Sequence, residues 1–243
     1  MLEEETVDRS ELLAAIGDAL MQLRDGFLGI RLTGSENSDW SHLAKWLKAS
    51  CDRSSVTLVH IGFHQSVGHG PLGVLQRLAD GLRKEGVACD RFGAGPLGSH
   101  DDEQGRLILL GEALMTDMES WSGQRSIAVL LEGTEKAEAG TLKWLEEWLL
   151  PELANRNIKL LAIVAEHSDG VGRDVAGLSR TYRLEPFTSG EIAEHLESRF
   201  GYSAEQSEKE ARSIFALSSG APLNVYLGLS QKRANSIKLF ANG

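Results

Sequence analysis

The chain has 243 residues, of which 42% are hydrophobic and 25% charged, and its formal net charge is −10 at pH 7. A chain of this length can bury a core without help from metals or disulfides, and its acidity argues against a nucleic-acid surface, which needs clustered Lys and Arg side chains. No apolar stretch approaches the roughly 20 residues that cross a bilayer, so no membrane association is expected.

The first third of the chain alternates between helix and strand patterns. Apolar residues at helical spacing predict a helix at about Ser10–Arg24, followed by a strand at Phe27–Thr33. The turn Gly34–Ser41, GSENSDWS, leads into a helix that runs to about Ala49. The run Ser55–Phe63 is typical of a parallel strand that is buried on both faces.

The middle of the chain continues this alternation. Pro71 lies early in a helix that ends near Gly86, as proline at a first helical turn and glycine after a last one indicate. The following segment, Cys89–Gly105, is rich in loop residues and is expected to be exposed. A helix at about Asp102–Met118 precedes the apolar strand Ser126–Leu131.

A further helix contains Trp144 and Trp148 on one face and is expected to end at Pro151. Two more strands are predicted, at Ile158–Glu166 and Thr181–Phe187. Strands that alternate with helices in this way indicate right-handed crossovers. We therefore expect an α/β fold with a parallel, doubly wound sheet.

The sequence changes character after Pro186 and predicts a small helical lid. Thr188 with Glu191, and Ser203 with Gln206, form capping-box patterns before amphipathic stretches. A third lid helix is expected to start around Pro222. The predicted domains are an α/β core with an N-terminal helix at 1–187 and the helical lid at 188–243.

The turn Gly34–Ser41 occupies the place of a phosphate-binding P-loop, G-x-x-x-x-G-K-[ST]. Gly34 and Ser41 fit this spacing, but Asp39 replaces the second glycine and Trp40 the lysine. A working loop presents backbone N–H groups and a lysine to phosphates, and its Ser or Thr binds magnesium. Asp39 instead places a carboxylate where the phosphate would bind. These eight residues alone are also compatible with an ordinary capped helix.

Four later segments lie where a P-loop ATPase would have its other motifs. The strand SIAVLLEGTEKA ends in Glu132 and Glu135, at the place of acids that bind magnesium and polarise water. The segment KLLAIVAEHSD matches a sensor strand, and YRLEPFTSGEIAEHL matches a junction to a lid. The last segment, ALSSGAPLNVYLGL, places Pro222 at the head of a lid helix.

With these segments in this order, the chain resembles the STAND branch of AAA+-like P-loop NTPases, the signal-transduction ATPases with numerous domains. The resemblance covers about Phe27–Ser230. It implies that Gly34 and Ser41 correspond to Walker A positions, from which Asp39 and Trp40 depart, and that Glu132 stands in place of the magnesium Asp.

The same resemblance places Gly133 and Glu135 at the small residue and second acid of Walker B, whereas Lys136 replaces the final acid. It also places Pro222 near an adenine. Because the departures coincide with phosphate and magnesium contacts, the resemblance implies an inactivated module, a pseudoenzyme with no catalytic residue, cofactor or metal.

The expected function is therefore a scaffold or regulatory interaction unit in bacterial signalling or conflict systems. Its expected partner is another protein, such as a separately encoded effector or sensor, unless the chain is a fragment of a larger protein. The alternative is an ATPase or GTPase switch with an unconventional loop that binds ATP or ADP with magnesium. A hydrolase of another α/β fold is a third possibility, but the sequence contains no G-x-S-x-G elbow.

Other residues carry weaker indications. His60, His64 and His69 cluster in sequence but lack a supplementary ligand at a zinc-motif spacing. Cys51 and Cys89 are the only cysteines and fit packing roles in a reducing cytoplasm. Trp121 lies in a polar turn and is the best single candidate for an anchor to a protein partner.

Overall fold

The computed structural model describes residues 4–7, 9–23, 26–34, 40–63, 70–94, 103–167, 178–184, 186–220, 225 and 228–229. The chain divides into two compact units. The α/β unit contains Met1–Thr33 and Trp40–Arg183, and the lid unit contains Gly34–Asp39 and Leu184–Gly243. The predicted boundary, after Phe187, lies close to this division.

The α/β unit is built on a sheet with the strand order β1-β6-β2-β5-β4-β3. Its strands are β1 (Glu4–Val7), β2 (Phe27–Gly34), β3 (Thr57–Gly62), β4 (Ile127–Glu132), β5 (Leu160–His167) and β6 (Arg180–Leu184). Without β1, the five parallel strands lie in the order β3-β4-β5-β2-β6, which is 2-3-4-1-5 when these five strands are numbered along the chain. This confirms the predicted doubly wound α/β fold. The strand β1 was not predicted, because its four residues, EETV, carry little apolar pattern.

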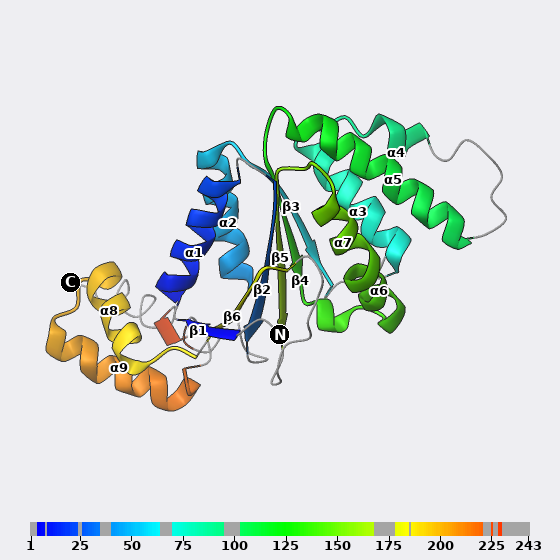
Figure 1. Ribbon diagram of the computed structural model, residues 1–243. Coiled ribbons are helices and arrows are strands. Elements are labelled where there is room, and N and C mark those ends of the chain that lie inside the picture. Colours follow the sequence, from blue (N-terminus) through cyan, green and yellow to red (C-terminus); the bar gives the residue numbers. More distant parts are fainter. Residues whose placement is uncertain are drawn as a thin grey trace, which may run out of the picture. The chain divides into compact units, whose positions relative to one another are not determined.

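Helices cover both faces of the sheet (Figure 1). One face carries α1 (Arg9–Gln22) and α2 (Trp40–Ser54), and the other carries the remaining helices of this unit. These are α3 (Pro71–Lys84), α4 (Asp90–Ala94), α5 (Glu103–Ser122), α6 (Ala139–Trp144) and α7 (Leu150–Asn155). Alternate strand residues such as Val59, Val129 and Ala162 pack beneath this second group and form the largest apolar cluster.

The helix that was expected to end at Pro151 continues through it. A π-helical turn, η2 (Leu145–Leu149), joins α6 to α7, and Pro151 lies in the first turn of α7. Proline has no backbone N–H and its ring crowds the preceding turn. The wider π turn precedes it directly, so the chain stays helical. Trp144 and Trp148 stack on this segment with ring centroids 5.5 Å apart, and both pack against the core, as predicted.

The expectation that Cys89–Gly105 is an exposed loop is wrong for its first residues. Cys89 and Phe92 are buried, and the short helix α4 begins at Asp90. The carboxylate of Asp117 on α5 accepts hydrogen bonds from the backbone N–H groups of Arg91 and Phe92. Asp117 therefore holds this segment in place. The glycines and charged residues of the segment are typical of a loop, so the sequence did not predict the helix.

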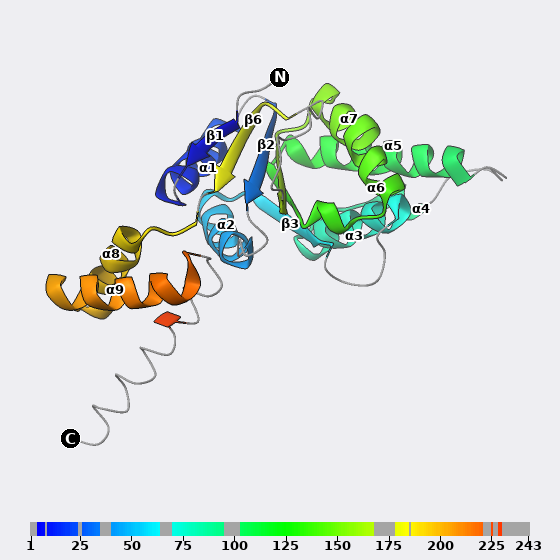
Figure 2. The ribbon, with the colours of Figure 1, turned by 90° about the horizontal axis from the view of Figure 1, so that it is seen from below.

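The lid unit contains α8 (Ser189–Phe200) and α9 (Ala204–Ser218), which lie side by side (Figures 1 and 2). Both predicted capping boxes are present, at Thr188 and at Ser203. Val225 and Leu229 complete the small apolar core of this unit. Pro222, where a third helix was expected to start, lies outside the described residues.

Gly220 closes the lid core against the chain that enters it. It has φ +76°, and its carbonyl accepts a hydrogen bond from the N–H of Phe187 at 2.8 Å. A Cβ at this position would lie 2.1 Å from the carbonyl oxygen of Phe187, which only glycine avoids. In the described part of the chain, no helix is both long and apolar enough to span a membrane.

Candidate functional site

The candidate site lies at the carboxyl ends of the parallel strands, where open α/β sheets bind ligands. Gly34 ends β2 and is buried, and Trp40 is the first residue of α2. Ser41 follows in the first turn of α2, and its side chain is not described. The remaining predicted positions, Asp39 and Pro222, lie outside the described residues.

Trp40 is packed into the site. Only 3% of its surface is exposed, and its ring lies 5.9 Å from the ring of His167, at the end of β5, with an angle of 33° between the planes. Its indole N–H is buried and has no hydrogen-bond partner among the described residues. Trp40, predicted from the sequence to stand in place of a P-loop lysine, is thus an aromatic side chain inside the protein.

The two predicted acids each bind a protein group. Glu132, at the end of β4, lies with its Oε2 2.6 Å from the Nε2 of His60 on β3. Glu135 is in the 3-10 turn η1 (Thr134–Lys136), and its Oε2 accepts a hydrogen bond of 3.2 Å from the backbone N–H of His167. The structure therefore brings Trp40 and Glu135 to the same residue, His167, while Glu132 pairs with a neighbouring strand.

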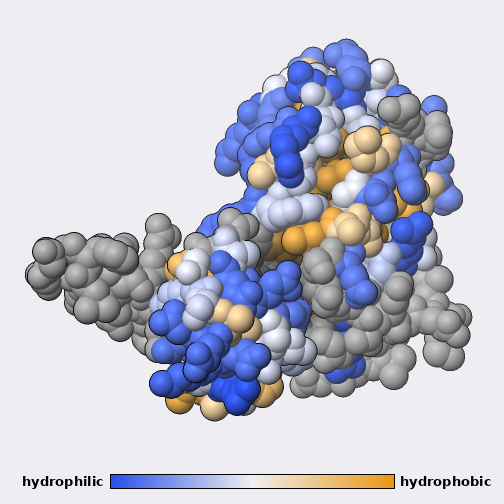
Figure 3. Space-filling model, turned by 90° about the vertical axis from the view of Figure 1, so that its left-hand side faces the viewer, coloured by the Kyte–Doolittle hydropathy of each residue, from blue (hydrophilic) through white to orange (hydrophobic). Residues whose placement is uncertain are grey.

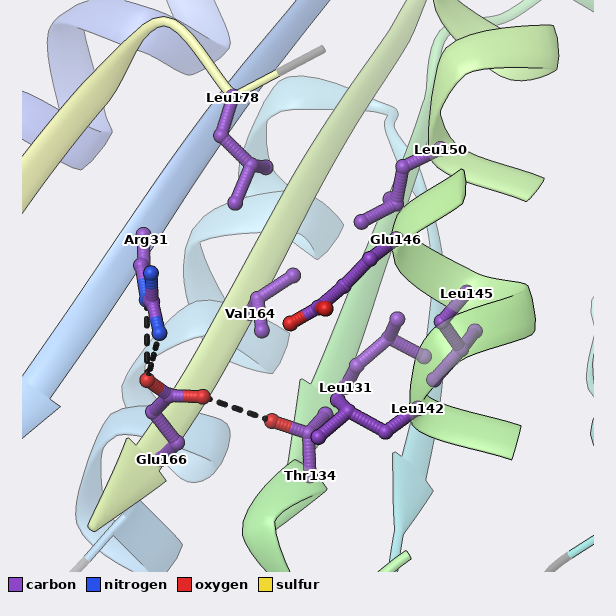
Figure 4. Close-up of a pocket in the computed structure, with 10 residues that line it drawn as sticks. All are labelled: Arg31, Leu131, Thr134, Leu142, Leu145, Glu146, Leu150, Val164, Glu166 and Leu178. Carbon is purple, nitrogen blue, oxygen red and sulfur yellow. Dashed lines mark hydrogen bonds and ion pairs between the residues drawn. The ribbon is translucent and has the colours of Figure 1, made fainter. Parts of the chain in front are cut away.

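A buried ion pair occupies the opposite face of the same strand ends (Figure 4). Arg31 of β2 donates through Nε and Nη2 to Glu166 of β5, the Nε contact being 2.9 Å. The hydroxyl of Thr134 donates to the other oxygen of Glu166 at 3.3 Å. These groups border a small pocket, and five of its ten lining residues are leucines, four of them from β4, α6, η2 and α7.

Sequence reasoning missed this ion pair, although a signal was present. Arg31 and Glu166 each interrupt an otherwise apolar strand. A charged residue in a strand buried on both faces requires a partner of opposite charge. The sequence could have indicated that each needs such a partner, but not that β2 and β5 are neighbours.

Comparisons with solved structures identify the fold of the chain. A chain of Drosophila ORC bound to DNA matches 94% of this chain with a TM-score of 0.61 and 17% identity, and 61% of its own length is covered. The Aeropyrum pernix ORC2 protein matches the whole chain with a TM-score of 0.61 and 11% identity, over 65% of its length. This chain has an AAA+-like fold.

A Walker-type ATPase of Pyrococcus abyssi shares the AAA+-like fold, with a TM-score of 0.59 and 15% identity over 96% of this chain and 71% of its own. This chain spans less than two thirds of the length of the two ORC chains. No protein-family model and no curated protein sequence matches it. At these identities, the likeness establishes the AAA+-like fold alone.

Within the AAA+-like fold, the other candidates have structural roles. Trp121, the expected partner anchor, lies near the end of α5, packs against the core and donates from Nε1 to the hydroxyl of Thr57 at 3.2 Å. It is therefore a packing residue. His64 and His69 lie outside the described residues, and no cluster of potential metal ligands occurs among the residues that are described.

The cysteines are packed rather than placed for chemistry. Both are buried, and burial raises the pKa of the Cys51 thiol to about 12. Burial also raises the pKa of Cys89. A protonated, inaccessible thiol is a poor nucleophile and metal ligand, which fits the packing role expected from the sequence.

Proposed function

We propose that this chain is a non-catalytic AAA+-like module of the STAND type. It acts as a scaffold or regulatory protein-interaction unit in bacterial signalling or conflict systems, with a separately encoded effector or sensor as its partner. The observation that carries the proposal is the burial of Trp40 against His167, at the position where a P-loop lysine would reach the phosphates.

Trp40 removes two contributions to phosphate binding. It supplies no positive charge, and its bulk fills space beside the first turn of α2. Phosphates bind at helix N-termini because backbone N–H groups and the helix dipole face them. A neighbouring carboxylate from Asp39 adds a negative charge in the same part of the sequence. Together these two residues oppose a triphosphate sterically and electrostatically.

The acids provide a second argument. Magnesium in NTPase sites is held by carboxylates and phosphates in a nearly ideal octahedral shell. Glu132 is 2.6 Å from His60, and its side chain is only 14% exposed. Glu135 accepts a backbone hydrogen bond from His167. Metal binding would compete with both interactions, which supports a module that does not use magnesium.

Calorimetry with ATP, ADP and GTP in the presence of magnesium tests the proposal. The wild-type chain should show no binding at near-millimolar nucleotide. The double variant Asp39→Gly/Trp40→Lys restores the P-loop pattern and should bind more tightly than wild type if these residues are the obstacle. Micromolar binding by the wild type, or a nucleotide that copurifies with it, would refute the proposal.

The alternative is a nucleotide-binding switch with an unconventional loop. One observation favours it: the indole N–H of Trp40 is a buried donor with no acceptor among the described residues. Native proteins rarely leave such a donor unsatisfied. Loss of a copurifying nucleotide from Trp40→Phe, which keeps an aromatic ring and removes the N–H, would support this alternative.

The proposed partner is a protein and not a nucleic acid. The similar Drosophila ORC structure is bound to DNA, but the net charge of −10 opposes a polyanion. Large apolar side chains are exposed on several helices, namely Met21, Leu72, Ile108, Leu109, Phe215 and Leu217. On the face in Figure 3, hydrophilic residues predominate and apolar residues gather between them.

Two measurements separate these partners. Titration of fluorescent duplex DNA at low salt should give no binding curve for this chain. Affinity capture from the native host, followed by reconstitution of the captured protein with purified components, should give a protein complex. A DNA complex that survives physiological salt would contradict the choice of partner.

A further inference from the structure

The turn that follows β4 bonds to both neighbouring strands. Glu132, directly before the turn, pairs with His60 of β3. Thr134, two residues later, donates to Glu166 of β5 and is 1% exposed. Glu135 accepts from the backbone N–H of His167, also on β5. Successive residues of one short segment thus contact the strands on either side of β4.

The contacts extend to a fourth strand and to both faces of the sheet. Glu166 is also bonded to Arg31 of β2, so β2 joins β5 and β4 through one carboxylate (Figure 4). Side chains alternate along a strand. Leu131 lines the pocket beside Arg31, and its neighbour Glu132 therefore projects from the opposite face.

The backbone of the turn suits these side-chain positions. The N–H of Gly133 donates to the carbonyl of Ala165 at 2.7 Å, and Gly133 adopts φ +74°. This left-handed conformation reverses the chain after β4 at a glycine, where it carries no Cβ penalty. Glu132 and Thr134 flank Gly133, so the main chain of the turn connects the His60–Glu132 contact to the Arg31–Glu166–Thr134 contacts.

We propose that Glu132, at the end of β4, and the turn that follows it form a cross-strand lock that holds the carboxyl ends of β2, β3, β4 and β5 in one arrangement. The inference rests on the proposed function, because a metal-binding Glu132 and a water-polarising Glu135 would have to leave their present partners. The lock makes this end of the sheet insensitive to nucleotide. Regulation of the module then comes from the protein partner and not from the phosphate state of a nucleotide.

Coupling within the lock gives a measurable signature. Hydrogen-bonded groups in a partly buried network support one another. Loss of the Thr134 hydroxyl should therefore loosen a bond in which Thr134 takes no part, that between the His167 N–H and Glu135. In Thr134→Val, amide exchange at His167 should rise about tenfold, as expected for loss of one net hydrogen bond. Thr134→Ser keeps the hydroxyl and should exchange like wild type.

A second, exposed substitution covers the case in which Thr134→Val does not fold. Glu135→Ala should raise amide exchange at Gly133, although the acceptor of that amide, the Ala165 carbonyl, is unchanged. Glu138→Ala is the matched control, since Glu138 is an exposed acid in the same connection and its side chain caps no helix. The amide of Val129, in the middle of β4, reports whether the effect stays local.

Hydrogen exchange is measured by NMR with and without about 1 mM magnesium ATP, a concentration of the size that weak nucleotide sites require. Faster exchange at His167 in Thr134→Val, with no effect of nucleotide on wild type, supports the lock. If exchange in Thr134→Val changes only at residue 134 itself, the lock is overturned, whatever calorimetry shows. Nucleotide-dependent exchange at His167 or Gly133 in wild type also overturns it. Calorimetric binding of nucleotide to the wild type, with unchanged exchange at His167 and Gly133, refutes the proposed function and with it regulation by the protein partner alone. Only the fixed arrangement of the strand ends then stays supported.

Discussion

Replacing Arg31 by methionine tests how strongly the buried ion pair supports the sheet. Arg31 and Glu166 have side chains that are 5% and 9% exposed. Methionine has a similar length and no charge, so the substitution leaves the Glu166 carboxylate with only the Thr134 hydroxyl from this network. Breaking one partner of a buried ion pair costs about 3–5 kcal/mol, because the remaining charge stays desolvated.

For a chain of this size, that loss corresponds to about 6–20 °C in Tm, at about 2–4 °C per kcal/mol. Urea unfolding followed by circular dichroism should give the free energy directly, with an unchanged m-value if the native state stays compact. The control is Arg212→Met in α9, which removes an exposed pair with Glu208. That pair should contribute at most about 0.5 kcal/mol.

The double variant Arg31→Met/Glu166→Gln separates a charge effect from a packing effect. The amide oxygen of the introduced glutamine can still accept from Thr134, and the buried charge is gone. Most of the stability lost in Arg31→Met should therefore return. A single variant that costs less than about 1 kcal/mol, or a double variant as unstable as the single one, would refute this account of the pair.

Three further predictions concern packing, thiol chemistry and the lid. Gly111→Ala should destabilise the fold by about 1–3 kcal/mol, because the added Cβ would lie 2.3 Å from the Trp148 ring. Gly17→Ala has open space around the added Cβ and should stabilise α1 by about 0.5–1 kcal/mol. Equal effects of the two substitutions on thermal unfolding would contradict this. Since burial raises the pKa of Cys51 from 9.0 to about 12, the thiol should resist alkylation in the folded chain. The contribution of the buried thiol to stability should be complete below pH 9 and fall as the pH rises toward 12. Rapid alkylation of Cys51 at about pH 8, below the ordinary thiol pKa, would count against its burial. Thr188→Ala should cost the lid about 0.5–2 kcal/mol through loss of the capping box, measured by amide exchange along α8, while the same change at Ser189, which makes no capping bond in that box, should cost less.

Much of the fold follows from patterns within single segments. Apolar runs such as Ile127–Leu131 indicate buried parallel strands, and the capping boxes at Thr188 and Ser203 define where the lid helices begin. These features depend on neighbours in sequence, which is why they could be predicted. The continuation of helix through Pro151 could not, because it depends on a π turn just before the proline.

The polar contacts of the site depend on strand order and were not predictable. His60 and Glu132 are 72 residues apart, and Arg31 and Glu166 are 135 apart. Each pair meets only because the sheet places β3 beside β4 and β2 beside β5. From the sequence, Glu132 could be assigned to a strand end, but its contact with His60 could be found only from the register of the strands.

The acids at the strand ends have protein partners, which gives the proposed degenerate site a physical explanation. A nucleotide site needs unpaired donors and acids that a ligand can satisfy. Here each acid is bonded within the protein, Glu132 to His60 and Glu135 to the His167 amide, and the buried ring of Trp40 lies at the position proposed for the lost lysine. To bind magnesium, acids paired in this way would first have to give up their bonds within the protein. The proposed loss of ligand binding and the retention of a well-packed scaffold can thus arise from the same few residues.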